Sequence, residues 1–178
     1  MSHYVDNQKF LEALKQRKLL VLEAENQGNE KPQVSNYLGE CIYKIANHLS
    51  YKANFINYSY RDEMVADGIE TSLRYIDNFD PEKSSNPFAY FTQIIYFAFL
   101  RRLTKEKKQS YIKNKILIEN HFDSFELQEH DEDGMYDVTY SDILQTSEDF
   151  VEEYESNIQK KKKKKQQKEF QLDEFLEE

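Results

Sequence analysis

The sequence predicts an all-α fold, and its composition and its hydrophobic pattern both support this prediction. Glycine and proline are scarce, with 4 and 3 residues among 178, whereas a turn-rich β fold needs more of both. Apolar residues recur every three or four positions in several stretches, which is the spacing of one face of an α-helix. Hydrophobic residues make up only 39% of the chain and charged residues 32%, so we expect one compact helical domain of about four helices and a charged tail, largely extended or partly helical.

Several classes of protein are excluded by the residues that the chain lacks. Its one cysteine cannot form an internal disulfide and fits a reducing compartment. No apolar run reaches the roughly 18 residues of a membrane span, and the first ten residues lack the apolar core of a signal peptide, so we expect a cytoplasmic protein without membrane contact. There is no glycine-rich phosphate loop, and the four histidines lack ligand spacing. We therefore expect neither an enzyme nor a metal or other cofactor.

The charge is distributed unevenly along the chain. The net charge of −9 would argue against nucleic-acid binding if it were spread evenly. However, residues 101–115 contain seven basic residues and one acid, and residues 119–159 contain fourteen acids and no lysine or arginine. Six consecutive lysines follow at Lys160–Lys165. Such asymmetry points to charged partners more directly than the total does.

Two helices are predicted before residue 53. The first covers residues 6–25, with Asp6 or Asn7 as its cap; its apolar face contains Phe10, Leu11, Leu14 and Leu22. The second covers about Gln33–Lys52, and its apolar stripe contains Val34, Leu38, Cys41, Ile42, Ile45 and Leu49. We interpret Cys41 as a core residue and His48 as a surface residue, because neither has a partner at ligand spacing.

The third predicted helix begins near Ser59, a suitable N-cap, and carries acids in its first turn. The buried stripe contains Met64, Val65, Ile69, Leu73 and Ile76, and Phe79 closes it. The opposite face contains Glu63, Asp67, Glu70 and Arg74. Composition alone favours a solvated helix face there, and a contact with a basic partner is the alternative.

The fourth predicted helix runs from Pro87 to about Lys108, because Asn86 is a good cap and proline favours the first helical position. Its apolar residues are Phe88, Tyr90, Phe91, Ile94, Ile95, Tyr96, Phe97, Phe99 and Leu100, which cover more than one face. A central position in a helical bundle explains part of this set. Aromatics beside a basic cluster also suit single-stranded or melted nucleic acid, because rings stack on bases and cations bind phosphates.

Order is harder to predict beyond Ile118. Ser147 is a candidate cap for a further helix, whose apolar face would contain Phe150, Val151, Tyr154 and Ile158. The lysine run Lys160–Lys165 cannot fold alone, because like charges repel, and it suits either a tether or a phosphate-binding patch. The final FQLDEFLEE restores apolar character, as in a docking peptide or a short helix that folds back on the core.

Within residues 60–108 stands the stretch EMVADGIETSLRYIDNFDPEKSSNPFAYFTQ. It resembles region 2 of bacterial sigma factors, and more specifically that of the late-transcription sigma factors of T-even-type bacteriophages. The Asp67–Gly68 pair precedes Phe79–Asp80 by the spacing of primary sigma factors, and residues 87–92 are similar to the segment that opens and reads the −10 element. The ending LDEFL is similar to the tail with which these phage factors bind the sliding clamp. With residues 33–52 as the preceding sigma helix, the resemblance covers about half the chain.

The resemblance implies three sets of binding residues. The residues expected to bind the clamp coiled coil of the largest subunit of host RNA polymerase are Glu63, Ala66, Asp67, Glu70 and Arg74. The residues expected to bind promoter DNA are Tyr90, Phe91, Gln93, Ile94, Tyr96, Phe97, Arg101, Arg102 and Lys105. The residues expected to bind the phage sliding clamp are Phe170, Leu172, Phe175 and Leu176.

The sequence departs from the sigma pattern at two places. Gln93 and Ile94 stand where primary sigma factors have a tandem tryptophan. Either a neighbouring tyrosine or phenylalanine substitutes for it or melting depends on weak A·T steps, and we favour the second because soft steps cost least to unstack. Nothing after residue 118 resembles the module that reads the −35 element. We therefore expect a sigma-2-like domain over 6–118, an acidic segment and tether over 119–165, and a clamp-binding tail over 166–178.

The implied function is promoter recognition at an AT-rich −10-like element by host polymerase in the cytoplasm of the infected bacterium. One alternative is a co-activator or anti-sigma-like protein that binds polymerase and clamp without reading DNA. A second alternative is a free-standing helical DNA-binding protein, which the net charge disfavours.

Overall fold

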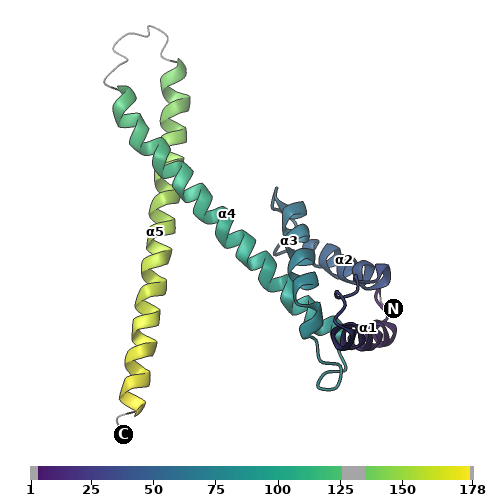
Figure 1. The fold of residues 1–178 in the computed structure, drawn as a ribbon. Helices are drawn as coiled ribbons and strands as arrows, with labels where there is room; N and C mark the ends of the chain where they lie inside the picture. The colour runs from purple at the N-terminus through teal and green to yellow at the C-terminus, as the bar shows by residue number, and fades with distance from the viewer. Residues whose placement is uncertain (1–3, 126–134, 177–178) are drawn as a thin grey trace. The chain divides into compact units, whose positions relative to one another are not determined.

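The structure is a computed structural model, and it describes residues 4–125 and 135–176, with side chains for 4–120 and 142–167. Every regular element in these residues is helical, which confirms the predicted all-α class. The elements, drawn in Figure 1, are α1 (Asn7–Gln27), α2 (Asn36–Ser50), α3 (Arg61–Arg74), the short 3₁₀ helix η1 (Ile76–Asn78), α4 (Pro87–Phe125) and α5 (Met135–Leu176).

The chain divides into two compact units, Met1–Thr104 and Lys105–Glu178, and α4 begins in the first and ends in the second. We call them the first unit and the second unit. The boundary falls inside the domain that the sequence predicts over 6–118. The difference arises because α4 continues as one helix to Phe125 instead of ending near Lys108.

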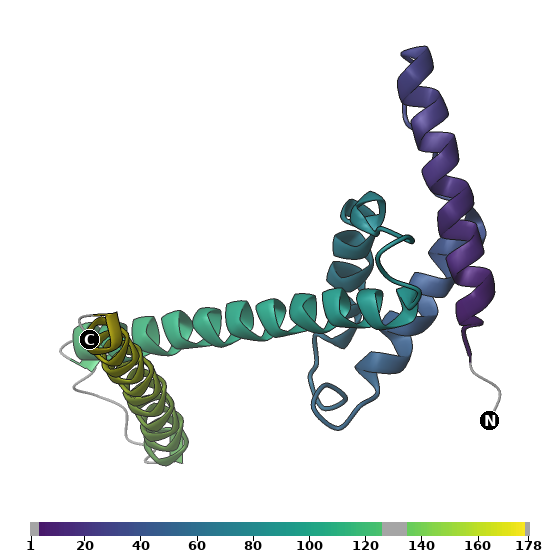
Figure 2. The same ribbon diagram turned by 90° about the horizontal axis from the view of Figure 1, so that it is seen from below.

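The first unit gathers α1, α2 and α3 around the beginning of α4 (Figure 2). The predicted stripe of α2 is confirmed from Leu38 to Leu49, all of whose members are buried, while Val34 is half-buried ahead of the helix. α4 contributes Phe91, Ile95 and Phe99 to the same core. The loop after α2 inserts Phe55, whose ring lies 5.1 Å from that of Phe99. Aromatic rings therefore fill the centre of the unit.

α1 begins as predicted, because the Asp6 carboxylate accepts hydrogen bonds from two backbone amides of its first turn. Phe10 and Leu14 are buried, but Leu22 is 47% exposed, so its predicted place in the core is wrong. Val21 is buried in its stead. The helix ends at Gly28, whose φ of 69° is a left-handed conformation that glycine adopts without steric cost.

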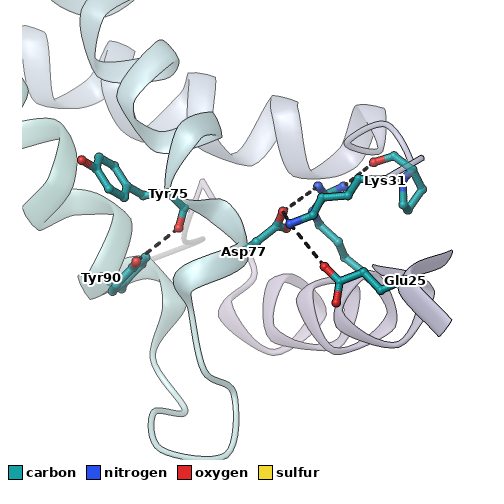
Figure 3. Close-up of polar contacts among 7 residues, drawn as sticks. Glu25, Lys31, Tyr75, Asp77 and Tyr90 are labelled. Carbon is teal, nitrogen blue, oxygen red and sulfur yellow. Dashed lines mark hydrogen bonds and ion pairs between the residues drawn. The ribbon is translucent and has the colours of Figure 1, made fainter. Parts of the chain in front are cut away.

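A buried arginine fastens α1 to η1. Arg17 donates to both carboxylate oxygens of Asp77, at 2.8 and 3.4 Å, and to the carbonyl of Pro32 at 3.2 Å. The Lys31 ammonium lies 3.9 Å from Asp77 and 3.5 Å from Glu25. These three side chains are labelled in Figure 3. The sequence prediction missed Arg17, because hydrophobic periodicity gives no weight to a charged residue on the buried face.

α3 begins at Arg61 with Tyr60 at the cap position, where no side-chain cap bond forms, so the predicted Ser59 cap is wrong by one residue. Its buried positions are Met64, Gly68 and Ser72, each four residues apart, while Leu73 of the predicted stripe is 37% exposed. Gly68, the smallest of them, lies where α4 approaches closely. A Cβ atom built on Gly68 would lie 3.0 Å from side-chain atoms of Ile95 and Phe99.

The start of α4 is confirmed at Pro87, and it is capped from two directions. The Asn86 side-chain oxygen accepts from the Ala89 amide at 3.1 Å, as a helix cap does. The Asn7 side-chain oxygen of α1 accepts from the Phe88 amide at 3.2 Å. The first turns of α1 and α4 are therefore tied together.

In the second unit, α5 pairs with the later part of α4. The rings of Tyr111 and Tyr154 stack with centroids 4.6 Å apart, and the Tyr111 hydroxyl donates to Glu155 at 2.7 Å. Lys115 donates to the same Glu155 oxygen at 3.3 Å. We call these four residues the Tyr111 clasp. Ser147 lies within α5, where its hydroxyl donates to the Ile143 carbonyl, so its predicted role as a helix cap is wrong.

Candidate functional site

The outward face of α3 carries most of the carboxylates predicted to bind a partner. Glu63, Ala66 and Glu70 are exposed, and Glu70 accepts from Arg74 one turn later at 2.6 Å. Both members of that pair are about two-thirds exposed, so the pair contributes little to stability. The face can therefore offer its charge to a basic surface without losing a packed contact.

Asp67 differs from these neighbours because it is paired inside the first unit. Arg102 of α4 donates to both its carboxylate oxygens, at 2.7 and 2.8 Å, in the two-pronged geometry that guanidinium and carboxylate favour. The side chain of Asp67 is 34% exposed and that of Arg102 is 18% exposed. Arg101 donates to the hydroxyl of Thr71 at 3.3 Å, one turn along α3. Sequence reasoning placed Asp67 and Arg102 against different partners, and the structure places them against each other.

The predicted DNA-binding residues of α4 fall into a buried group and an exposed group. Phe91 is fully buried, so its ring cannot stack on a base in this conformation. Tyr90 is half-buried, and its hydroxyl donates to the Tyr75 carbonyl at 3.3 Å (Figure 3). Partial burial raises the pKa of the Tyr90 phenol above its ordinary value. Ile94 is also half-buried.

The exposed group lies on one side of α4. Gln93 is exposed, and Tyr96 and Phe97 are 37% and 49% exposed. The ring of Tyr96 rests edge-on against Phe55 of the core at 5.7 Å, and against Phe97 at 6.0 Å. Rings supported in this way can present a face to solvent without folding inward.

An open hollow follows on the same helix. It is lined by Phe97, Leu100, Arg101 and Thr104, which recur at helical spacing. We call these four residues the α4 stripe. Leu100 and Thr104 were not among the predicted site residues, although their spacing from Phe97 and Arg101 could have revealed them. Arg101 is exposed, so its guanidinium borders an apolar surface that fits the flat face of a base or a ring.

The remaining predicted site residues belong to the second unit. Lys105 is exposed and is the first residue of the second unit. The side chains of Phe170, Leu172, Phe175 and Leu176 lie outside the described residues, although the backbone of α5 is helical to Leu176.

The contacts of Cys41 and His48 are those of residues that pack against the fold. Cys41 is buried, and burial raises the pKa of its thiol, so little thiolate forms near neutral pH. Burial and a hydrogen bond with Cys41 raise the pKa of Tyr37 to about 12. The His48 ring stacks on that of Tyr4 at 3.9 Å. In the part of the chain with described side chains, no group of three or more histidine, cysteine or acidic residues could hold a metal ion.

No protein-family model matches the chain, and none of the curated proteins matches it. None of the helices within residues 4–125 and 135–176 is both long and apolar enough to cross a membrane.

Proposed function

We propose that this chain is a sigma factor that directs host bacterial RNA polymerase to phage late promoters with an AT-rich −10-like element. The observation that carries the proposal is the α4 stripe with its neighbour Tyr96. Tyr96, Phe97 and Leu100 keep aromatic and apolar surface exposed beside Arg101. The same helix buries Phe91, Ile95 and Phe99 in the core. Surface of this kind suits an unstacked strand, because bases stack on rings and phosphates pair with guanidinium groups.

The proposed mechanism begins with polymerase binding through α3. Glu63 and Glu70 present carboxylates to the basic coiled coil of the largest subunit, and complementary charge raises the association rate and fixes the orientation. Asp67 is held by Arg102 and contributes through that pair. The three carboxylates lie on one side of α3 because they are spaced by three and four residues.

The second step is recognition of the melted element by α4. Tyr96 and Phe97 supply stacking surfaces, Gln93 supplies an amide, and Arg101 supplies a cation for the backbone. Bound single strands gain about 1–3 kcal/mol for each stacked base. Gln93 cannot wedge between bases as tryptophan does, so opening requires steps that unstack easily, such as TA.

The third contact is the C-terminal tail on the sliding clamp. Phe170, Leu172, Phe175 and Leu176 recur at the spacing of an apolar helix face or a docking peptide. A clamp on the same DNA would raise the effective concentration of the polymerase complex at the promoter.

A polymerase- and clamp-binding co-activator that does not read DNA is the second candidate function. It is favoured by the burial of Phe91 and by the pairing of Arg102 with Asp67, since both reduce the set of groups available to DNA. It predicts that the α4 stripe is not needed for promoter choice.

One experiment separates the two candidates. Core polymerase is reconstituted with the native chain or with a Tyr96→Ala, Arg101→Ala variant, and initiation is measured on duplex and premelted AT-rich templates. The sigma proposal predicts that promoter-selective initiation falls at least tenfold, because about 1.4 kcal/mol of lost binding corresponds to that factor. The control is Tyr43→Ala, which removes a tyrosine from α2 that is 52% exposed, compared with 37% for Tyr96. Unchanged selectivity in the double variant would support the co-activator.

A further inference from the structure

The lysine run Lys160–Lys165 is a strongly charged surface that the proposed function leaves without a role. All six residues are exposed on α5, and Gln159, Gln166 and Gln167 flank them. No aspartate or glutamate lies three or four positions from any of Lys160–Lys164, so the neighbouring turns supply no counter-charge to these residues. The run instead brings like charges together at the spacing that repels within a helix.

We propose that the lysine run binds the phosphate backbone of duplex DNA without reading its sequence, at a site separate from the α4 stripe. The proposal does not depend on the sigma function. It depends on the number, spacing and angular distribution of charge on a helix, which differ from what a protein or membrane partner would require.

The angular distribution favours a partner that surrounds the helix. Successive residues turn by roughly 100°, so six consecutive lysines leave no face wider than about 100° without a cation. A flat acidic protein surface touches one side of a helix and would use about half of them. The major groove of duplex DNA is about 12 Å wide and admits a helix, with phosphates along both walls. Lysines on all sides can then act together.

The spacing of charge also fits a duplex. The run places one cation for each helical rise of about 1.5 Å. A duplex carries one phosphate charge per ~1.7 Å of its axis, whereas each strand alone carries one per ~3.4 Å. The linear charge densities of the helix and the duplex therefore nearly match, and a single strand offers about half as much.

The residues around the lysine run do not extend its contact with a partner beyond Lys160–Lys165. Residues 159–167 contain no apolar side chain, so the segment lacks the apolar face that a helix needs to lie in a membrane surface. The preceding turns carry Glu148, Asp149, Glu152, Glu153 and Glu155. These acids repel DNA, but salt screens them over a distance of about 10 Å at 0.1 M. The net charge of −9 thus lowers the affinity without cancelling the local site.

The test measures binding of the full chain to a fluorescent duplex of about 30 bp that lacks AT-rich steps, in the absence of polymerase. Affinity is followed by anisotropy across a series of salt concentrations. The variants are Lys→Gln at all six positions and Lys→Arg at all six positions. The control is Lys9→Gln with Lys15→Gln, which removes exposed lysines from α1. A single strand of the same length and polyglutamate serve as comparison probes.

The expected result is a change in salt dependence. Each phosphate contact contributes roughly 0.9 to the slope of log affinity against log salt, so the glutamine variant should lose about 5 from its slope when all six lysines bind. The arginine variant and the α1 control should keep the native slope. The loss of affinity should be larger for the duplex than for the single strand.

Three outcomes would overturn the proposal. An unchanged slope in the glutamine variant would place DNA binding elsewhere. A decrease of about 3 or less in the slope of log affinity against log salt would mean that only one face of the helix contacts DNA. If the glutamine variant loses as much affinity for polyglutamate as for the duplex, the partner is an acidic protein. Each outcome leaves the sigma proposal unaffected, because neither promoter nor polymerase is present.

Discussion

The two units hold their helices in different ways. The first unit buries four phenylalanines completely, at positions 10, 55, 91 and 99, and its helices follow the apolar pattern of the sequence. Among the described side chains of the second unit, Ser147 is the one buried residue, and Ile112, Ile116, Ile143 and Ile158 remain exposed. The first unit is thus stabilised by its core. The second relies on the Tyr111 clasp and on the helix propensity of its lysine, glutamine and glutamate residues.

The largest expected effect is the loss of a core ring from the first unit. Phe99→Ala removes a fully buried side chain and should lower the free energy of unfolding by about 3–5 kcal/mol, a large part of the stability of a small domain. Urea denaturation followed by circular dichroism measures it. The control is Phe97→Ala, which removes the same ring from an exposed position on the same helix. Equal losses for the two variants would contradict the description of the core.

The second effect tests the close approach of α3 and α4. Gly68→Ala adds a Cβ atom 3.0 Å from Ile95 and Phe99, and overpacking of this kind typically costs about 1–3 kcal/mol. Gly39→Ala makes the same change within α2, where no atom lies within 4 Å of the added carbon. It should stabilise the chain by up to about 1 kcal/mol through helix propensity. Thermal unfolding of both variants gives the comparison, and a shift of the same sign in both would argue against a tight contact.

The Asp67–Arg102 pair should have a smaller effect. A double-mutant cycle with Asp67→Ala and Arg102→Ala should give a coupling energy of about 1 kcal/mol, because the bond is two-pronged but still partly exposed. The Glu70–Arg74 pair, which is more exposed, provides the matched cycle and should give less. A larger coupling in the exposed pair would reverse the order that burial predicts.

The smallest effect is a pH dependence of the second unit. Hydrogen bonds from Tyr111 and Lys115 lower the pKa of Glu155 below its ordinary value of 4.5. A carboxyl with a lowered folded-state pKa contributes stability that is present above pH 4.5 and is lost as the pH falls through that lowered pKa. Helicity should therefore decrease below pH 4.5, and Glu155→Gln should remove this part of the decrease. An identical acid titration in the variant would show that other carboxyls cause the change.

Sequence reasoning worked where burial follows hydrophobic periodicity. The α2 stripe, the Asp6 cap and the Asn86–Pro87 start were all predicted, because local propensity and core packing agree there. It failed where a polar or small residue takes a buried position. Arg17 is buried because Asp77 neutralises it, and Gly68 fits the buried face of α3 because α4 comes close there. Such positions depend on tertiary contacts that a one-dimensional pattern does not contain.

The same limit explains the candidate site. The exposed aromatic and basic character of α4 was predicted, and Tyr96, Phe97 and Arg101 have the exposure that the prediction requires. Phe91 has the same residue type as Phe97 but points into the core, where its ring packs against Phe10 of α1 and against Phe79, which follows η1. The pairing of Asp67 with Arg102 joins residues 35 positions apart. No local pattern could have predicted that bond.

The contacts between α3 and α4 also affect the entropy of binding. Gly68 lets the two helices touch, and the Asp67–Arg102 bond fixes their rotation relative to each other. The carboxylate face of α3 and the α4 stripe are therefore in mutual register before any partner arrives. Ordering two surfaces on association would cost free energy for each immobilised element. In this chain the two helices are already ordered by folding, so a partner that binds one helix finds the other in a fixed orientation.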